Sequence, residues 1–427
     1  MKLHWQIFIA LILAVVAGLI TGIDATVFGI RFYAIYDFFG TLFLNGLKMI
    51  IVPLVVSSII VGISGIGNSG AFGRLGIRTL IYYFTTTLIS VIIGLMVVNF
   101  IDPGIINGEP VKDLIGLQGD VSNITASAEG RRASDIVQVF TRMVPPNIIA
   151  AAANGQMLGL IFFSVLFGYF MTRIAKQHAE TLKSVWTGLY EVMLLITLFI
   201  MRFAPIGVFG LVAKVVADAG EDDIAQLAET LGYFFISVVL ALAIHIFIFM
   251  PIVLRFVAKV NPLRHYRAMA PALLTAFSTA SSSATLPLSI KCVEENAGVS
   301  NRTASFVLPL GATVNMDGTA LFECVAAMFI AQAYGLDLSL TTQFAIVVLA
   351  LMTSIGVAAV PSASLVAITV ILTYIGLPAE GIALIYAVDR VLDMCRTAVN
   401  VFSDSCGAVV IGKLEGEQGI LQEDPAR

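Results

Sequence analysis

The run Thr275-Ala-Phe-Ser-Thr-Ala-Ser-Ser-Ser-Ala-Thr-Leu-Pro-Leu-Ser289 is rich in hydroxyl groups, yet it lies in an apolar part of the chain. Residues 353–364, Thr-Ser-Ile-Gly-Val-Ala-Ala-Val-Pro-Ser-Ala-Ser, repeat this pattern. Irregular backbone at membrane depth requires protein or a water-filled cavity to satisfy its polar groups. Two proline-interrupted segments in corresponding halves of a chain are typical of a membrane site built on inverted repeats. Hydroxyl groups can also serve helix packing or bond to their own helix, but the pair of segments favours two re-entrant hairpins.

Composition places these segments in a membrane protein. Of the 427 residues, 58% are hydrophobic and 12% are charged, whereas soluble domains are ~45–50% apolar and ~25% charged. So few charges could not cover the surface of a soluble protein of this size. Composition therefore excludes most soluble enzymes, disordered chains and nucleic-acid binders, and we expect no nucleic-acid partner. It predicts an all-α polytopic protein in a lipid bilayer.

Six apolar stretches before residue 260 are candidates to cross the membrane, which takes roughly 20 residues each. They cover residues 5–22, 38–64, 79–101, 136–175, 184–213 and 230–258. The loops expected between them alternate in charge: 66–78, 172–183 and 255–267 are basic, and 102–135 and 214–229 are acidic. Because basic loops stay in the cytoplasm, this alternation predicts six crossings with a cytoplasmic N-terminus and an uncleaved first span.

A further span carries amide and carboxyl groups. Residues 311–319 read Gly-Ala-Thr-Val-Asn-Met-Asp-Gly-Thr, and the Asn, Asp and Gly together should unwind a helix and free its carbonyl groups. An ionised Asp317 inside a bilayer would cost several kcal/mol, so it needs a partner, most simply a cation.

The last span carries a polar stripe. Its members are Asp389, Asp393, Arg396, Thr397, Asn400 and Asp404. Their separations of 4, 3, 1, 3 and 4 residues place them on one face of a helix. A self-neutralising seam of ion pairs around Arg396 is the structural alternative, but it would leave one or more acids unpaired. Because ionisable groups inside a membrane are functional by default, we expect a binding site with bound cations.

Together, the two hairpin segments, the Asn-Met-Asp-Gly-Thr motif and the Asp-rich last span resemble the dicarboxylate/amino acid:cation symporter family. This family includes excitatory amino acid transporters and archaeal sodium-aspartate transporters. The resemblance implies eight transmembrane helices and two re-entrant hairpins, in a homotrimer of the inner (plasma) membrane with both termini cytoplasmic. It also implies sodium-coupled uptake of aspartate or glutamate by an elevator movement. No enzyme activity is implied, and no cofactor apart from the co-transported sodium ions.

The resemblance also divides the chain. Spans 1, 2, 4 and 5 would form a scaffold from residues 1–78 and 136–213, and residues 79–101 and 226–415 would form a transport unit. Within this unit, hairpin 1 is expected at about 262–295, span 7 at about 300–334, hairpin 2 at about 337–375 and span 8 at about 380–412. Residues 416–427 would be a cytoplasmic tail.

Carried over residue by residue, the resemblance implies that Arg396 binds a substrate carboxylate through its guanidinium fork and that Asp393 binds the α-ammonium. The expected substrate site is Ser281, Ser282, Thr319, Val360, Asp393, Arg396, Thr397 and Asn400. Three cation sites with oxygen ligands are implied. The first uses Gly311, Asn315, Asn400 and Asp404; the second uses Tyr83, Thr86, Thr87, Asn315 and Asp317; the third uses Thr313, Ser354 and Ile355.

Some features depart from the family pattern or leave alternatives. Family members often have an Arg at the position of Ala280 or Met394, and more glycines at the second hairpin tip. Proton coupling through a buried carboxyl (Asp389, Asp404 or Glu323) is the alternative to sodium, and a C4-dicarboxylate is the alternative substrate. An intramembrane hydrolase using Ser282 would need a nearby base. The one histidine within a span, His245, has no suitable partner in the motif region, so we interpret it as a packed or interface histidine and not as a catalytic base.

Overall fold

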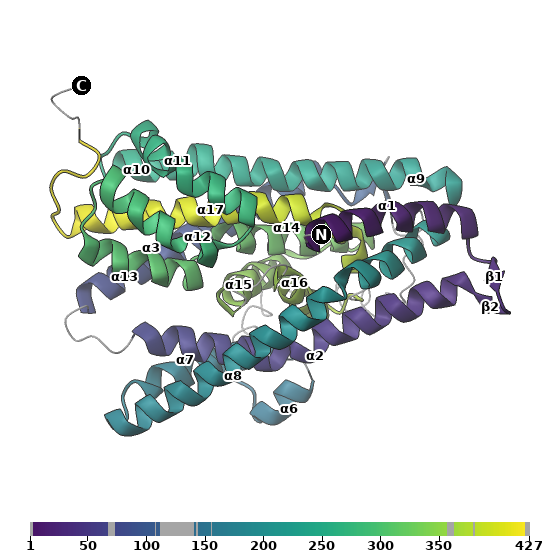
Figure 1. Cartoon of the computed structure of the whole chain (residues 1–427), viewed down its shortest axis with the longest axis horizontal. Helices are drawn as coiled ribbons and strands as arrows, with labels where there is room; N and C mark the ends of the chain where they lie inside the picture. Colours follow the sequence, from purple (N-terminus) through teal and green to yellow (C-terminus); the bar gives the residue numbers. More distant parts are fainter. Residues whose placement is uncertain are drawn as a thin grey trace.

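The computed structural model describes residues 3–66, 73–106, 108–111, 141, 144–154, 156–356, 363–378 and 381–422. Its elements are α1 Leu3–Thr21, β1 Thr26–Val27, β2 Ile30–Arg31, α2 Phe32–Ile66, α3 Gly73–Ile101, β3 Ile105–Ile106, β4 Glu109–Pro110, α6 Ile148–Ala153, α7 Met157–Met171, α8 Lys176–Arg202, α9 Ala204–Ile244, η2 His245–Phe249, α10 Met250–Phe256, α11 Pro262–Thr279, α12 Ser282–Lys291, η3 Cys292–Asn296, α13 Asn301–Val314, α14 Asp317–Ala333, α15 Leu340–Gly356, α16 Ala363–Ile375 and α17 Ile382–Leu414. The short strands form two antiparallel pairs, and most of the described chain is helical (Figure 1). This confirms the predicted helical class.

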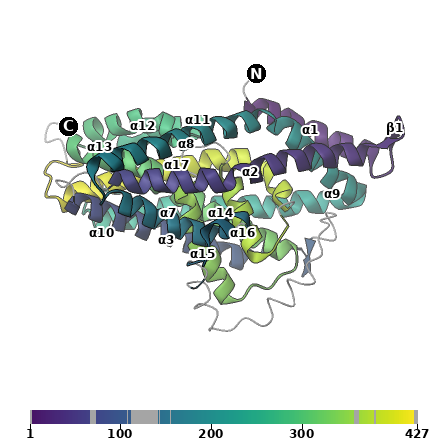
Figure 2. The ribbon, with the colours of Figure 1, turned by 90° about the horizontal axis from the view of Figure 1, so that it is seen from below.

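Several helices have the length and apolar composition of membrane spans. Five such segments in the described residues are Phe32–Ser64, Leu75–Ile101, Lys176–Ile200, Ala228–Phe256 and Asn301–Ala333. Shorter apolar helices are Ile9–Thr21, Gly159–Met171, Ala204–Ala217, Leu340–Ser354 and Ser364–Ile375. The long helices α2, α9 and α17 run along the long axis of the molecule, with the β1–β2 hairpin at one end and the last turns of α17 at the other (Figures 1 and 2). The chain is thus built as a bundle of apolar helices.

Helix α9 corrects one prediction. The sequence predicts a loop at 214–229, but α9 is helical from Ala204 to Ile244. The helix break lies instead at Phe203, directly after α8, so the apolar stretch 184–213 is divided between two helices. Residues 214–229 contain no proline and four alanines, which favour helix. The acidic residues make this stretch polar, but none of its residues is a proline that would interrupt the helix.

The residues expected for hairpin 1 contain α11 and α12, which contact each other. Between them Ala280 adopts a left-handed conformation (φ 48°, ψ 42°) that ends α11. Ser281 then caps α12, because its side-chain oxygen accepts a hydrogen bond from the Ala284 backbone N–H at 3.2 Å. For the second hairpin, α15 and α16 contact each other, and its expected tip, including Val360, lies outside the described residues.

The predicted unwinding within span 7 is confirmed. Asn315 (φ −99°, ψ 90°) and Met316 (φ −114°, ψ 54°) are not helical, and they separate α13 from α14. Almost every residue of α14 is buried, and this helix packs against α3, α9, α15, α16 and α17. Phe329 of α14 stacks on Phe234 of α9 with ring centroids 4.6 Å apart. The broken helix therefore brings polar backbone and side chains into the centre of the bundle.

Candidate functional site

Arg396 of α17 lies at the centre of a buried group of ion pairs. Its side chain is 1% exposed. Nη1 donates to Ser364 Oγ of α16 at 2.9 Å, and Nη2 donates to Asp389 Oδ1 at 2.9 Å and to Asp393 Oδ1 at 3.0 Å. The guanidinium carbon lies 3.8 Å from the ring centroid of Phe322 on α14. Stacking on an aromatic ring and pairing with two carboxylates fix the plane of the guanidinium.

This group leaves two polar atoms unused. Arg396 Nε and Asp393 Oδ2 are buried and form no hydrogen bond within the described part of the chain. Arg390 Nη1 lies 3.5 Å from Asp393 Oδ2, which makes an ion pair but a poor hydrogen bond. Arg396 therefore pairs with both acids, as the structural alternative predicts, yet a buried donor and a buried acceptor remain. Unsatisfied buried groups of this kind call for a ligand or another explanation.

Asn400 joins α17 to the first turn of α14. Its Oδ1 accepts from the Gly318 backbone N–H at 2.7 Å, and its Nδ2 donates to Thr319 Oγ1 at 3.1 Å. A Cβ atom on Gly318 would lie 2.7 Å from the Arg396 carbonyl oxygen, so only glycine allows the two helices to approach here. Thr397 lies on the same helix, and its hydroxyl donates to its own helix backbone at 2.8 Å. The expected substrate residues of α14 and α17 are thus close together.

The hairpin members of the expected substrate site are connected less directly. Ser281 caps α12 and Ser282 is buried at the start of that helix. Helix α12 contacts α17, but within the described residues no hydrogen bond joins either serine to Arg396. Their role in substrate binding therefore stays a prediction, as does that of Val360.

A second polar cluster surrounds Asp317, whose side chain is fully buried. Oδ1 accepts from Thr87 Oγ1 at 2.6 Å and from Thr86 Oγ1 at 3.5 Å, both on α3. Oδ2 accepts from Ser403 Oγ of α17 at 2.6 Å and lies 3.0 Å from His245 Nε2 of η2. Four elements that are distant in sequence therefore meet at one carboxylate.

Asn315 connects Asp317 to a second carboxylate. Its Oδ1 accepts from the two α3 threonines at 3.2 and 3.4 Å. Its Nδ2 donates to Ser403 Oγ at 3.0 Å and to Asp404 Oδ1 at 2.9 Å. A Cβ atom on Gly311 would lie 2.4 Å from Asp404 Oδ1, so the α13 backbone lies directly against this carboxylate. Carboxylate, amide and hydroxyl oxygens in such proximity are among the ligands that hard cations take.

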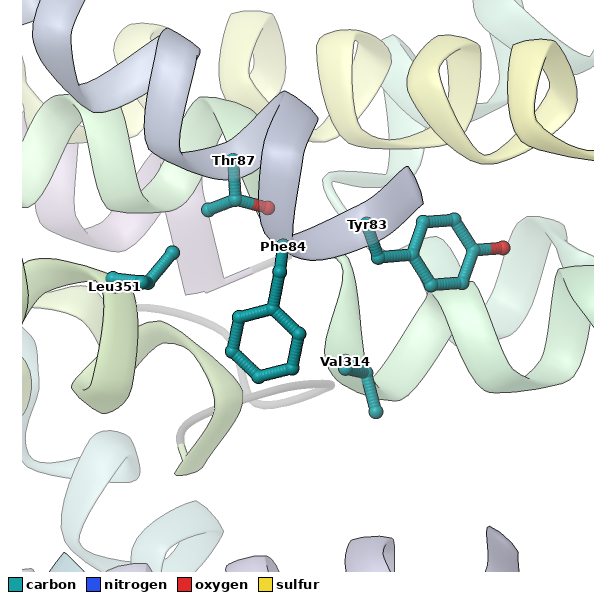
Figure 3. A pocket seen from close by; sticks show the side chains of 5 residues that line it. All are labelled: Tyr83, Phe84, Thr87, Val314 and Leu351. Atoms are coloured by element: carbon teal, nitrogen blue, oxygen red, sulfur yellow. The ribbon is translucent and has the colours of Figure 1, made fainter. Parts of the chain in front are cut away.

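A narrow surface depression lies beside this cluster on the side of α3. It is lined by Tyr83, Phe84, Thr87, Val314 and Leu351 (Figure 3). Thr87 belongs to both the depression and the cluster around Asp317. The Tyr83 hydroxyl donates to the Val307 carbonyl at 2.8 Å, so it is held close to α13.

The members of the expected third cation site are not joined to one another. The Thr313 hydroxyl is exposed and donates to the Leu310 carbonyl at 2.9 Å, and the Ser354 hydroxyl donates to the Leu351 carbonyl at 3.0 Å. No hydrogen bond among the described residues links Thr313 to Ser354, and the side chain of Ile355 lies outside the description. This site stays a prediction.

His245 and Ser403 are members of the Asp317 cluster that the sequence interpretation does not include. The interpretation that His245 has no partner in the motif region is wrong, because its Nε2 lies 3.0 Å from Asp317 Oδ2. The two residues are 72 positions apart, and no local pattern pairs them. Ser403 lies seven residues after Arg396, which is about two helical turns along the same face. The periodicity of the stripe could have identified Ser403.

Comparison with known proteins identifies the family. A model of the sodium:dicarboxylate symporter family matches residues 3–414. The chain belongs to this family. The resemblance in the sequence is therefore confirmed. Because the family is one of symporters and the relatives described next are named as symporters or transporters, the chain is a transporter and not an enzyme.

Three relatives show how far the similarity extends. The chain is 36% identical over 421 residues to the proton/glutamate-aspartate symporter of Escherichia coli (strain K12), which covers 97% of this chain and 93% of that protein. It is 36% identical over 419 residues to the proton/sodium-glutamate symport protein of Geobacillus stearothermophilus, covering 97% and 95%. It is 34% identical over 458 residues to excitatory amino acid transporter 1 of Ambystoma tigrinum, covering 94% and 82%.

Proposed function

We propose that this chain imports an acidic amino acid, aspartate or glutamate, together with sodium ions. Two buried atoms carry the proposal: Arg396 Nε and Asp393 Oδ2, neither of which has a hydrogen-bond partner among the described residues, although the two side chains are paired through Nη2 and Oδ1. An acidic amino acid has a carboxylate for the guanidinium fork and an ammonium for the aspartate. A C4-dicarboxylate has no ammonium and would place like charges together at Asp393. A neutral amino acid has no side-chain anion for Arg396.

The proposed cation ligands support sodium as the coupled ion. Asp317, Asp404 and Asn315 form a buried set of oxygen atoms completed by the α3 threonines. Asp317 is followed by Gly318, whose N–H donates to Asn400 beside the proposed substrate site. A cation at Asp317 and a substrate at Asn400 therefore act on the same helical turn. If each ligand stabilises the same arrangement of this turn, each raises the affinity for the other.

For the architecture we propose eight spans, two re-entrant hairpins and an elevator movement in a homotrimer of the plasma membrane, with both termini cytoplasmic. The position of the polar residues supports a division into two units. Among the described residues, the proposed ligands lie on α3, α12, α13, α14, α15 and α17 or, for Ser281 and Asn315, directly next to one of them, in the proposed transport unit of residues 79–101 and 226–415. Helices α1, α2, α7 and α8, in the proposed scaffold of 1–78 and 136–213, contribute none of them.

The direct test is uptake of radiolabelled aspartate into proteoliposomes. We expect accumulation when sodium outside exceeds sodium inside, and loss of accumulation when choline replaces sodium at constant pH. A matched set with glutamate, malate and alanine separates an acidic amino acid from a dicarboxylate and from a neutral amino acid. Equal uptake driven by a pH gradient alone would refute sodium coupling.

Proton coupling is the second candidate, and Glu323 of α14 favours it. Its side chain is fully buried, Oε2 accepts from Thr353 Oγ1 at 2.7 Å, and Oε1 has no hydrogen-bond partner in the described chain. A buried carboxyl oxygen without a donor is a position where a bound proton would be stabilising. The Escherichia coli relative is named as a proton symporter. Under this candidate, Glu323→Gln abolishes uptake driven by a pH gradient, whereas sodium-driven uptake in that variant would refute it.

A further inference from the structure

We propose that His245 is a positioning residue for cation binding, because it fixes the orientation of the Asp317 carboxylate. The inference rests on the proposed cation coupling and adds a residue from η2 to it. His245 Nε2 lies 3.0 Å from Asp317 Oδ2, and both side chains are fully buried. A buried contact of this length between an imidazole and a carboxylate is a charge-assisted hydrogen bond.

The two carboxylate oxygens of Asp317 have different hydrogen-bond partners. A carboxylate only accepts, so His245 Nε2 carries the hydrogen and donates to Oδ2. Ser403 Oγ donates to the same oxygen at 2.6 Å. These two donors hold Oδ2, and Oδ1 therefore points to the side of Thr87 and Asn315, where the other candidate ligand oxygens lie. Groups behind a ligand that fix its orientation in this way commonly change affinity by 10–100-fold.

The local backbone explains how the His245 ring reaches Asp317. The regular helix α9 passes at this residue into the π-helical turn η2, a form that occurs mostly as short bulges at functional sites. The imidazole stacks on the Phe249 ring with centroids 5.3 Å apart. In the same turn the Ile246 carbonyl accepts a hydrogen bond from the Tyr266 hydroxyl. Stacking on Phe249 therefore restrains the imidazole in addition to its contact with Asp317.

His265 provides a matched comparison within the same chain. It is also fully buried, and its Nε2 lies 2.9 Å from Ser405 Oγ. In both histidines, Nδ1 has no hydrogen-bond partner among the described residues. The difference is that the partner of His265 is a hydroxyl group, whereas the partner of His245 is Asp317. A loss of stability from removing a buried histidine should therefore appear in variants of both His245 and His265. A loss of cation affinity should appear only in variants of His245.

The test compares His245→Met and His245→Gln with His265→Met in proteoliposomes. Two quantities are measured: the half-saturating sodium concentration, and the KM for aspartate at saturating sodium. Methionine cannot donate, and the loss of one hydrogen bond to a charged group corresponds to about tenfold or more in affinity. We expect His245→Met to raise half-saturating sodium about tenfold or more, with the aspartate KM changed less than about threefold. His245→Gln, whose amide can donate to Oδ2, should restore most of the sodium affinity.

The outcomes separate this inference from the proposed function. Wild-type uptake that is independent of sodium refutes the proposed function and the inference with it. Sodium-dependent wild-type uptake with an unchanged sodium requirement in His245→Met refutes the positioning role alone. An equal shift in His265→Met also refutes it. If His245→Met does not fold, His245→Gln is compared with His245→Asn, whose shorter amide does not reach Asp317. A higher sodium requirement in the Asn variant supports the role, and equal requirements refute it.

Discussion

Replacing Arg396 tests the proposed substrate site at its central residue. Arg396→Cys removes the hydrogen bond from Nη1 to Ser364 and the hydrogen bonds from Nη2 to Asp389 and Asp393. It also removes the guanidinium fork that would bind a substrate carboxylate. Arg396→Lys keeps the positive charge but has no planar fork, so it cannot bind a carboxylate through two parallel hydrogen bonds. The pair of variants therefore separates charge from geometry.

The magnitude follows from the bonds that are lost. Each hydrogen bond to a charged group contributes about 1.5–3 kcal/mol, so loss of a bidentate carboxylate contact in Arg396→Cys costs about 3–6 kcal/mol. This corresponds to about 10²- to 10⁴-fold weaker aspartate binding. Arg396→Lys loses one of the two bonds, which corresponds to about 10- to 10²-fold.

Stability has to be controlled because Asp389 is buried and loses its partner in Arg396→Cys. Breaking a buried ion pair on one side costs about 3–5 kcal/mol. Asp393 keeps its ion pair with Arg390. The double variant Asp389→Asn/Arg396→Cys removes the charge at Asp389, so it should fold better than the single variant and still bind aspartate weakly.

The assay is aspartate binding to purified protein at saturating sodium, together with uptake of a neutral amino acid such as serine. Arg396→Cys should bind aspartate at least about 10²-fold more weakly and gain relative preference for the neutral substrate. An aspartate affinity within threefold of wild type in the folded double variant would refute the role of Arg396.

Three further predictions concern other parts of the molecule. Asp404→Asn should raise the sodium concentration needed for half-maximal uptake more than it changes the preference for aspartate over serine, and an unaltered sodium response would remove Asp404 from the cation site. Ala280→Gly should stabilise the fold by about 1 kcal/mol, because glycine adopts the left-handed conformation between α11 and α12 without strain. The unfolding temperature in detergent should therefore rise. An unfolding temperature at or below that of wild type would contradict the strain at Ala280. Burial raises the pKa of Glu417, but hydrogen bonds from Ser300 and Thr303 outweigh burial and hold this pKa below its usual value of 4.5. Its contribution to stability is therefore complete above pH 4.5 and lost as pH falls through the lower folded pKa, so Glu417→Gln should lower the unfolding temperature at pH 7 and make it less sensitive to acid than in wild type.

Local patterns predict those parts of the site that lie on a single element. The spacing from Asp389 to Asp404 places the stripe on one face of α17, because a helix repeats its faces every 3.6 residues. The unwinding at Asn315 follows from neighbouring residues that disfavour helix, and the structure has it at that position. Both features depend on only a few consecutive turns of chain.

Contacts between distant elements were not predictable in the same way. His245 and Asp317 are 72 positions apart, and His245 begins a π-helical turn that apolar periodicity does not indicate. The charge pattern did not predict the helical backbone of residues 214–229 for a different reason. Charge pattern reports the polarity of a segment, whereas helix formation depends on residue propensity and on packing.

The central claim is that substrate and sodium bind to one coupled site, and its most direct test is the aspartate Kd of the purified protein over a range of sodium concentrations. Choline replaces sodium to keep ionic strength constant, and pH is held fixed. The coupled site predicts an aspartate Kd that falls by more than tenfold as sodium rises from trace to saturating levels, with at least a tenfold smaller dependence in Asp317→Asn. An aspartate Kd that stays the same at every sodium concentration would contradict the claim.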